Sequence, residues 1–110
     1  MENDKPILVY ATFPSPEEAE RIGGRLVDDG LAACVNILPG MVSIYVWQGQ
    51  RQRDSECAMI VKSRASLAAP IIRTIRGLHP YENPAVVVLD TAGGSQPFLD
   101  WIMAETSGGG

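Results

Sequence analysis

The feature that most constrains the fold of this chain is that three strand-like segments are apolar at consecutive positions. These segments are ILVYA at 7–11, CAMIV at 57–61 and VVVL at 86–89. A strand with one solvated face alternates apolar and polar side chains, whereas a continuous apolar run predicts burial on both faces. The short helices of a 110-residue chain can cover only one face of a sheet. We therefore expect other protein to cover the second face, and homo-oligomerisation is the simplest way to supply it.

The order of strand-like and helix-like segments predicts how that sheet is connected. We expect strands at 7–13, 31–38 with 41–47, 55–64 and 85–90, and helices at 16–29, 66–78 and 96–105. Ser15 and Ser66 are expected to cap the first two helices. This order is the split βαβ, or ferredoxin-like, pattern of an α+β fold, in which both main helices lie on one face of an antiparallel sheet. The last helix is an addition to that pattern.

The chain is short enough for a single domain spanning residues 1–110. We expect an ordered core of about 5–105 and a flexible tail formed by the final SGGG sequence, which has almost no side chains to pack.

Proline and glycine predict three local features. Pro39 and Gly40 fall inside the second strand-like segment and indicate a kink or bulge in one long strand. The polar stretch 48–54 is predicted to be a hairpin loop. Gly23 and Gly24 lie inside the first helix, where each costs about 1 kcal/mol relative to alanine. Their presence predicts that the helix backbone packs closely against another element.

Composition excludes some partners. The net charge of -4 argues against binding to nucleic acid, which requires clustered basic residues. No apolar stretch reaches the roughly 20 residues of a membrane span, and the N-terminal MENDKP sequence does not resemble a signal peptide. We therefore expect a cytoplasmic protein with no membrane partner. Cys34 and Cys57 are widely spaced and should both be reduced thiols.

Three motifs in the same order resemble the CutA family, the divalent-cation tolerance proteins. They are LAACVNILPGMVSIYVWQGQ at 31–50, IVKSR at 60–64 and HPYENP at 79–84, and the resemblance covers roughly residues 5–105. It implies a ferredoxin-like fold assembled as a tight homotrimer, similar in architecture to the PII signalling proteins. It also implies a role in tolerance to copper and other divalent metals, without an established reaction. Relatives in animals and plants are linked to the anchoring of partner proteins.

The HPYENP motif has a structural and a functional interpretation. His79 and Asn83 each precede a proline, which favours an extended backbone, so the motif can simply end a helix and begin a strand. Alternatively, His79, Glu82 and Cys34 provide an imidazole, a carboxylate and a thiolate, which suit copper or, less readily, zinc. One histidine and two distant cysteines cannot complete a four-ligand site within a subunit. Any metal site is therefore expected between subunits.

Two positions argue against tight copper binding. Some CutA proteins carry a cysteine and a second histidine where this sequence has Ala11 and Leu78. Cys34 lies on the more polar side of its strand, where both packing and metal ligation are open to it. Cys57 lies between apolar neighbours and is expected to pack. A divalent metal is thus a possible ligand of the protein, and no cofactor is required.

A cleft for a small ligand is also indicated. Tyr45 and Trp47 share a strand face, and together with Lys62 and Tyr81 they can line a pocket between subunits, because such pockets combine aromatic walls with a few polar groups. Trp47 can instead anchor the hairpin or a subunit interface, where tryptophan is enriched.

The sequence supports two functions. The leading one is a trimeric, non-enzymatic tolerance protein that binds copper or another divalent metal weakly at an inter-subunit cleft. The alternative is a PII-like signalling or adaptor module that binds a small ligand or a protein partner in that cleft. An enzyme is less supported, because the sequence has no recognisable nucleophile with its base, phosphate loop or pair of catalytic carboxylates.

Overall fold

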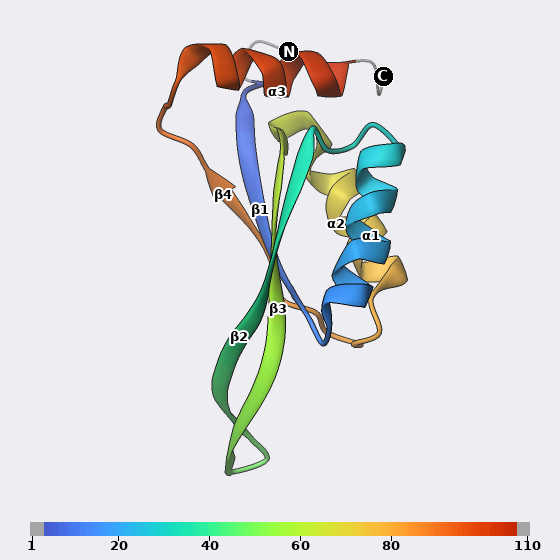
Figure 1. The fold of residues 1–110 in the computed structure, drawn as a ribbon, viewed down its shortest axis with the longest axis vertical. Coiled ribbons are helices and arrows are strands. Elements are labelled where there is room, and N and C mark those ends of the chain that lie inside the picture. The colour runs from blue at the N-terminus through green and yellow to red at the C-terminus, as the bar shows by residue number, and fades with distance from the viewer. Residues whose placement is uncertain (1–3, 108–110) are drawn as a thin grey trace.

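The computed structural model describes residues 4–107 and has the predicted order of elements (Figure 1). The elements are β1 Pro6–Phe13, α1 Pro16–Asp28, β2 Cys34–Trp47, β3 Gln50–Arg64, the 3-10 helix η1 Ala65–Leu67, α2 Ala68–Leu78, β4 Val86–Asp90 and α3 Gln96–Ser107. The sheet order is β2-β3-β1-β4, and each neighbouring pair is antiparallel. The predicted ferredoxin-like α+β fold is confirmed. Of the predicted SGGG tail, Ser107 ends α3, and the three glycines lie outside the described residues.

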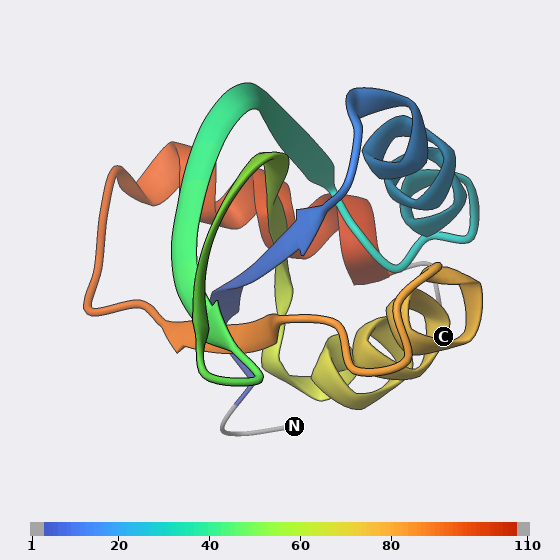
Figure 2. The ribbon, with the colours of Figure 1, turned by 90° about the horizontal axis from the view of Figure 1, so that it is seen from below.

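Helices α1 and α2 cover one face of the sheet (Figures 1 and 2). Helix α1 begins as predicted, because the Ser15 hydroxyl accepts a hydrogen bond from the Glu18 N–H at 3.3 Å and Pro16 occupies the first turn. Its apolar side chains meet those of alternate strand residues. The core between helices and sheet includes Ile7, Val9, Ala11, Phe13, Ile22, Leu26, Met59, Val61, Ile71 and Ile75.

One of the two helix glycines packs closely against the sheet. A Cβ atom at Gly23 would lie 2.9 Å from Met59 Sδ and 3.0 Å from Val35 Cγ2, whereas at Gly24 it would meet nothing within 4 Å. The predicted close packing is therefore confirmed for Gly23 and wrong for Gly24.

The start of α2 differs from the prediction. The residue that caps α2 is Leu67, which makes no side-chain capping bond, and η1 precedes the helix. Ser66 instead donates hydrogen bonds to the Asp4 carboxylate from its N–H at 2.9 Å and its hydroxyl at 2.8 Å. Arg64 forms an ion pair with Asp4 at 3.0 Å and donates a hydrogen bond to Thr106 at 2.9 Å. These bonds hold the end of β3 against the segment before β1 and against the last turn of α3.

The β2–β3 hairpin is longer than expected, and the predicted loop at 48–54 is wrong. Strand β3 already begins at Gln50, so the turn consists of Gln48 and Gly49. Both have positive φ, 51° and 78°, as in the tight primed turns that fit the twist of a hairpin. The polar residues that follow have the composition of a loop, but they pair with β2, for example Asp54 with Ser43. The hairpin projects from the body of the molecule (Figure 1).

Large apolar side chains stay exposed on the parts of the sheet that α1 and α2 do not cover. Val46 is 70% exposed and Trp47 is 61% exposed. We call this set the uncovered surface; it comprises Leu38, Val42, Ile44, Tyr45, Val46 and Trp47 on the hairpin, Val87, Val88 and Leu89 on β4, and Phe98 and Trp101 on α3. One chain does not provide the two-sided burial that the strands predict.

Helix α3 lies across the end of the sheet where β1 begins (Figure 1). Its Ile102 is buried, whereas Phe98 and Trp101 stack on each other with ring centroids 5.9 Å apart and stay partly exposed. Among residues 4–107, no helix combines the length and apolar character needed to cross a membrane.

Candidate functional site

His79, the first residue of the HPYENP motif, is built into the protein as a corner. Its ring is 8% exposed and stacks on Phe13, with ring centroids 4.9 Å apart. The Tyr81 N–H donates a hydrogen bond to Nδ1 at 3.0 Å, which requires that Nδ1 carry no proton. Nε2 then carries the proton and donates it to the Thr12 carbonyl at 2.7 Å. Both ring nitrogens are therefore occupied, and a metal ion would have to displace one of these bonds.

The three predicted metal ligands are not gathered within one subunit. Cys34 pairs with Lys62, which pairs with Leu8 at the start of β1, whereas His79 contacts Thr12 near the end of β1. Four residues of strand separate Leu8 from Thr12, about 13 Å along the strand. Among the described residues 4–107, no group of three or more His, Cys, Asp or Glu side chains is placed to hold a metal ion.

The two cysteines have different surroundings. Cys57 is fully buried on the helix-covered face, and burial raises the pKa of its thiol, so it packs as predicted. Cys34 is partly exposed at the beginning of β2. Both are free thiols.

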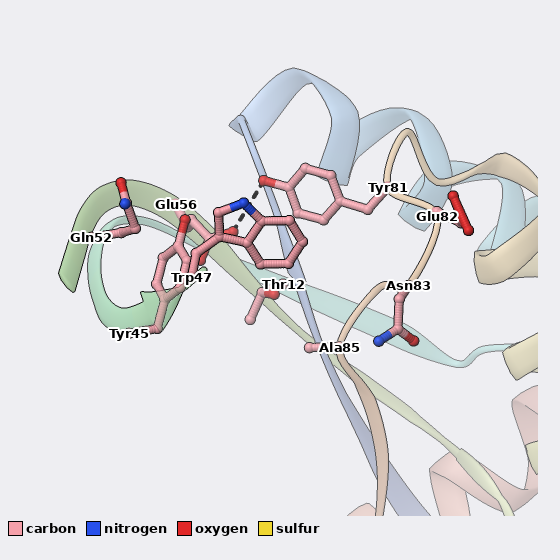
Figure 3. Close-up of a pocket in the computed structure, with 9 residues that line it drawn as sticks. All are labelled: Thr12, Tyr45, Trp47, Gln52, Glu56, Tyr81, Glu82, Asn83 and Ala85. Atoms are coloured by element: carbon pink, nitrogen blue, oxygen red, sulfur yellow. Dashed lines mark hydrogen bonds between the residues drawn. The ribbon is translucent and has the colours of Figure 1, made fainter. Parts of the chain in front are cut away.

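A cleft of about 720 Å³ lies between the hairpin and the HPYENP corner (Figure 3). Three of the four predicted cleft residues line it: Tyr45, Trp47 and Tyr81. The fourth, Lys62, does not line the cleft, and its amino group lies 5.3 Å from the Phe98 ring of α3. Glu82, predicted as a metal ligand, also lines the cleft. The lining residues that we did not predict are Thr12, Gln52, Glu56, Asn83 and Ala85.

The predicted bulge in β2 directs Tyr45 and Trp47 into this cleft. The pairs Leu38–Ala58 and Met41–Glu56 show that β2 takes three steps where β3 takes two. Gly40, with φ of 82°, permits this irregularity. The extra residue reverses which side chains of β2 face each side of the sheet, since strand side chains alternate. Tyr45, paired with Gln52, thereby shares a face with Glu56.

Two tyrosines of the cleft donate their hydroxyl protons to carboxylates. Tyr45 bonds to Asp54, and Tyr81 bonds to Glu56 at 3.2 Å (Figure 3 shows the second bond). The hydrogen bond to Asp54 is the main cause that raises the pKa of Tyr45 to about 12, with smaller effects from burial and from the Asp54 and Glu56 charges. Burial and then the Glu56 charge raise the pKa of Tyr81. The nearby carboxylates contribute to both shifts, Asp54 and Glu56 at Tyr45 and Glu56 and Asp54 at Tyr81.

The charge of the cleft is unbalanced. Glu56 and Glu82 line it directly, and Asp54 lies behind the Tyr45 hydroxyl. Within the part of the chain that the structure describes, no lysine, arginine or histidine lines the cleft. The arrangement can therefore attract cations, and its aromatic rings provide apolar walls.

Comparison with known proteins identifies the family. A family model described as "CutA1 divalent ion tolerance protein" matches residues 7–105. The chain is 41% identical to the divalent-cation tolerance protein CutA of Thermus thermophilus over 99 residues, which is 90% of this chain and 96% of that protein. A solved structure, the periplasmic divalent cation tolerance protein CutA of Archaeoglobus fulgidus, is 40% identical with a TM-score of 0.88, covering 92% of this chain and 98% of the other.

The relatives also correct one expectation. The chloroplastic protein CutA of Arabidopsis thaliana is 41% identical over 91% of this chain, which spans 55% of that protein's length. Because similar proteins are named chloroplastic or periplasmic, the predicted cytoplasmic location is wrong as an inference from this sequence. The cytoplasmic prediction rested on the lack of a recognisable signal in this sequence. That observation does not distinguish the compartments, because the chloroplastic relative is longer than the part that matches this chain. The motifs, fold and matched length agree, and the chain belongs to the CutA1 divalent ion tolerance protein family.

Proposed function

We propose that the protein contributes to divalent-cation tolerance as a non-enzymatic homotrimer that binds divalent metal ions weakly at the cleft beside the hairpin. The observation that carries this proposal is the excess of carboxylates in the cleft, where Glu56 and Glu82 have no basic neighbour in the lining. Family membership supports the role in tolerance. We infer metal binding from the carboxylates of the cleft. We infer the trimer, and the position of the cleft between subunits, from the exposed apolar residues of the hairpin and β4.

The uncovered surface supports assembly. The apolar residues of the hairpin and β4 form exposed areas that are unusual on an isolated soluble chain. Strands β2 and β4 are also the edges of the sheet, so their outer backbone groups can pair with another strand. A symmetric assembly of copies of this chain would cover both the side chains and the edges. The cleft lies beside the hairpin and would then be completed by a neighbouring subunit.

The carboxylates support weak metal binding. Glu82 is exposed and makes no side-chain hydrogen bond to residues 4–107, so both of its oxygens can accept a cation. Glu56 accepts one hydrogen bond, from Tyr81, and can still provide an oxygen. Figure 3 shows the Glu82 side chain on the far side of the HPYENP corner from Glu56, so each carboxylate alone would leave most of the coordination of a metal ion to water or to another subunit. Copper is favoured over zinc because it binds most nitrogen and oxygen ligands more strongly.

Calorimetric titration of the purified protein with copper tests this function. Replacing Glu82 with glutamine should weaken copper binding about tenfold, since a charged ligand becomes neutral. Glu20→Gln, which removes the same charge from the exposed surface of α1, is the matched control and should leave binding unchanged. If both variants bind copper as the parent does, the cleft is not the metal site.

His79→Ala separates the two interpretations of HPYENP. The variant should bind copper as the parent does, because the ring nitrogens of His79 are already bonded to Thr12 and Tyr81. It should lose about 2 kcal/mol of unfolding free energy, since a buried carbonyl and a backbone N–H lose their partners. Loss of copper binding in a folded His79→Ala protein would show instead that the corner opens to bind the metal.

We propose the PII-like alternative as a second function because aromatic rings make up much of the cleft wall. Trp47 has no atom that ligates a metal, and the hydroxyls of Tyr45 and Tyr81 are already bonded to carboxylates, yet all three side chains line the space. Its volume of about 720 Å³ suits a small organic ligand better than a single ion. Native mass spectrometry of the protein purified from cells tests this function, because a copurified organic ligand would add a defined mass to the assembly.

A further inference from the structure

The lining of the cleft indicates which chemical class of ligand it accepts. We propose that the cleft binds an organic cation, an ammonium or guanidinium group, which lies against the rings of Trp47, Tyr45 and Tyr81 and is neutralised by Glu56 beside them. This proposal rests on the second function above, in which the cleft takes a small ligand.

The rings favour a positive group. The face of an aromatic ring carries negative potential, and tryptophan attracts a cation more strongly than tyrosine or phenylalanine does. Trp47 is 61% exposed, so a ligand can reach its ring without displacing core side chains. Its strand neighbour Tyr45 and the corner residue Tyr81 line the same cleft from two elements that lie far apart in the sequence (Figure 3).

The hydrogen bonds of the tyrosines discourage an anionic ligand. Both hydroxyl protons are already donated to carboxylates, Tyr45 to Asp54 and Tyr81 to Glu56. They are therefore not available to a phosphate or a ligand carboxylate. The other side-chain donors of the lining are the Thr12 hydroxyl, the Gln52 and Asn83 amides and the Trp47 indole, and no basic side chain from residues 4–107 is among them. An anion such as a nucleotide would meet the negative charge of Glu56, Glu82 and Asp54 without a compensating group.

An organic cation fits the remaining features better than a bare metal ion does. Aromatic rings offer no lone pair that replaces the water of a hydrated metal, and the described residues hold no three-ligand group. A quaternary ammonium ion has no N–H group to bind water, and its carbon atoms can lie against the rings. The two functions therefore use different groups of one cleft: the carboxylates alone for metal, and the rings with Glu56 for the organic ion.

Titration with tetramethylammonium chloride tests this proposal. Binding is measured by calorimetry and by the shift of the Trp47 indole N–H resonance, assigned by its loss in Trp47→Phe. Neopentyl alcohol is the uncharged probe of similar shape, acetate is the anionic probe, and sodium chloride holds the ionic strength constant. Tetramethylammonium should saturate and shift the Trp47 resonance, while neopentyl alcohol and acetate should do neither over the same concentration range.

Variants of the cleft sharpen the test. Trp47→Leu and Glu56→Gln should each weaken tetramethylammonium binding about tenfold, because one removes a ring face and the other a counter-charge. Tyr81→Leu should weaken binding in the same way. Tyr81→Phe keeps the ring and loses only the bond to Glu56, so it should bind tetramethylammonium more tightly than Tyr81→Leu does. The surface variant Glu20→Gln controls for net charge.

Each other result overturns the proposal in a recognisable way. Equal binding of neopentyl alcohol would show that the cleft is an apolar site without charge selectivity. Stronger binding of acetate would show that it takes anions. In both cases the cleft remains a ligand site and the second function survives. If no probe shifts the Trp47 resonance, the cleft is not a small-ligand site, and the second function fails as well. Copper binding, tested through Glu82→Gln, is decided independently.

Discussion

The helix-covered face of the sheet and the uncovered surface are similar in sequence and opposite in environment. Val9, Met59 and Ile75 are completely buried between sheet and helices, whereas Val46 is 70% exposed. In β4, three consecutive apolar residues remain exposed although the pattern predicts burial on both sides. An apolar strand sequence therefore predicts that a surface is covered, but it does not indicate whether the same chain or another chain covers it.

The same division separates the two candidate sites. His79 belongs to the covered side, where it stacks on Phe13 and both its nitrogens are satisfied. Trp47, Glu82 and Tyr81 lie where the chain provides no cover, and their polar atoms or rings remain accessible. We infer that structural polar groups lie on the covered side and ligand-binding groups on the other.

The largest expected contrast is between Phe13→Ala and Val46→Ala. Phe13 is fully buried, so its truncation should lower the free energy of unfolding by about 3–5 kcal/mol. Val46→Ala should have an effect that depends on protein concentration, because the proposed assembly would cover its side chain. Denaturant unfolding at two protein concentrations measures both effects.

A concentration-independent change of less than about 0.5 kcal/mol in Val46→Ala is the behaviour of an ordinary exposed residue. That result would remove the hairpin tip from any subunit interface. A similarly small effect in Phe13→Ala would contradict the packing of the covered face itself.

Two adjacent glycines test how closely α1 packs against the sheet on the helix-covered face. Gly23→Ala should destabilise the protein by about 1–3 kcal/mol, because the new methyl group would press on Met59 and Val35. Gly24→Ala should stabilise it by up to about 1 kcal/mol, since alanine is the better helix former and meets no neighbour there. Thermal unfolding of both variants measures the pair. Equal shifts in the same direction would contradict the close approach at Gly23.

The smallest expected effect is confined to the cleft. Tyr45 should ionise near pH 12, because its hydroxyl proton is held by the negatively charged Asp54. The stabilising contribution of this bond is present below the ordinary tyrosine pKa of 10.0 and is lost as the pH rises toward 12. Ultraviolet titration follows the ionisation. In Asp54→Asn, one tyrosine should ionise at lower pH than in the parent; unchanged curves would show that the bond does not persist in solution.

Much of the fold could be predicted from the sequence because local signals were strong. Ser15 with Pro16 specified the start of α1, and Pro39 with Gly40 specified the bulge in β2. The loop predicted at 48–54 is wrong because the strands of a solvent-exposed hairpin can be as polar as a loop. Composition alone does not distinguish the two. The start of α2 was misplaced because Ser66 binds Asp4, a residue distant in sequence.

The candidate site was only partly predictable. Tyr45 and Trp47 could be assigned to one strand face by alternation, but Glu56 joined them only through the register change at the bulge. The occupied nitrogens of His79 depend on the Thr12 carbonyl, a backbone atom 67 residues away that no side-chain pattern reveals. Lys62 lies on the expected face of its strand, but its amino group lies against the Phe98 ring of α3. The sequence gives no sign of that contact.

We propose that copies of this chain cover the apolar residues of the uncovered surface that lie outside the cleft. Light scattering coupled to size-exclusion chromatography at micromolar concentration tests it most directly. Because one chain has a mass of 11.9 kDa, the homotrimer should elute as a single species of about 36 kDa. A soluble species with the mass of one chain would contradict the claim, since the exposed residues of the hairpin and β4 would then remain in water.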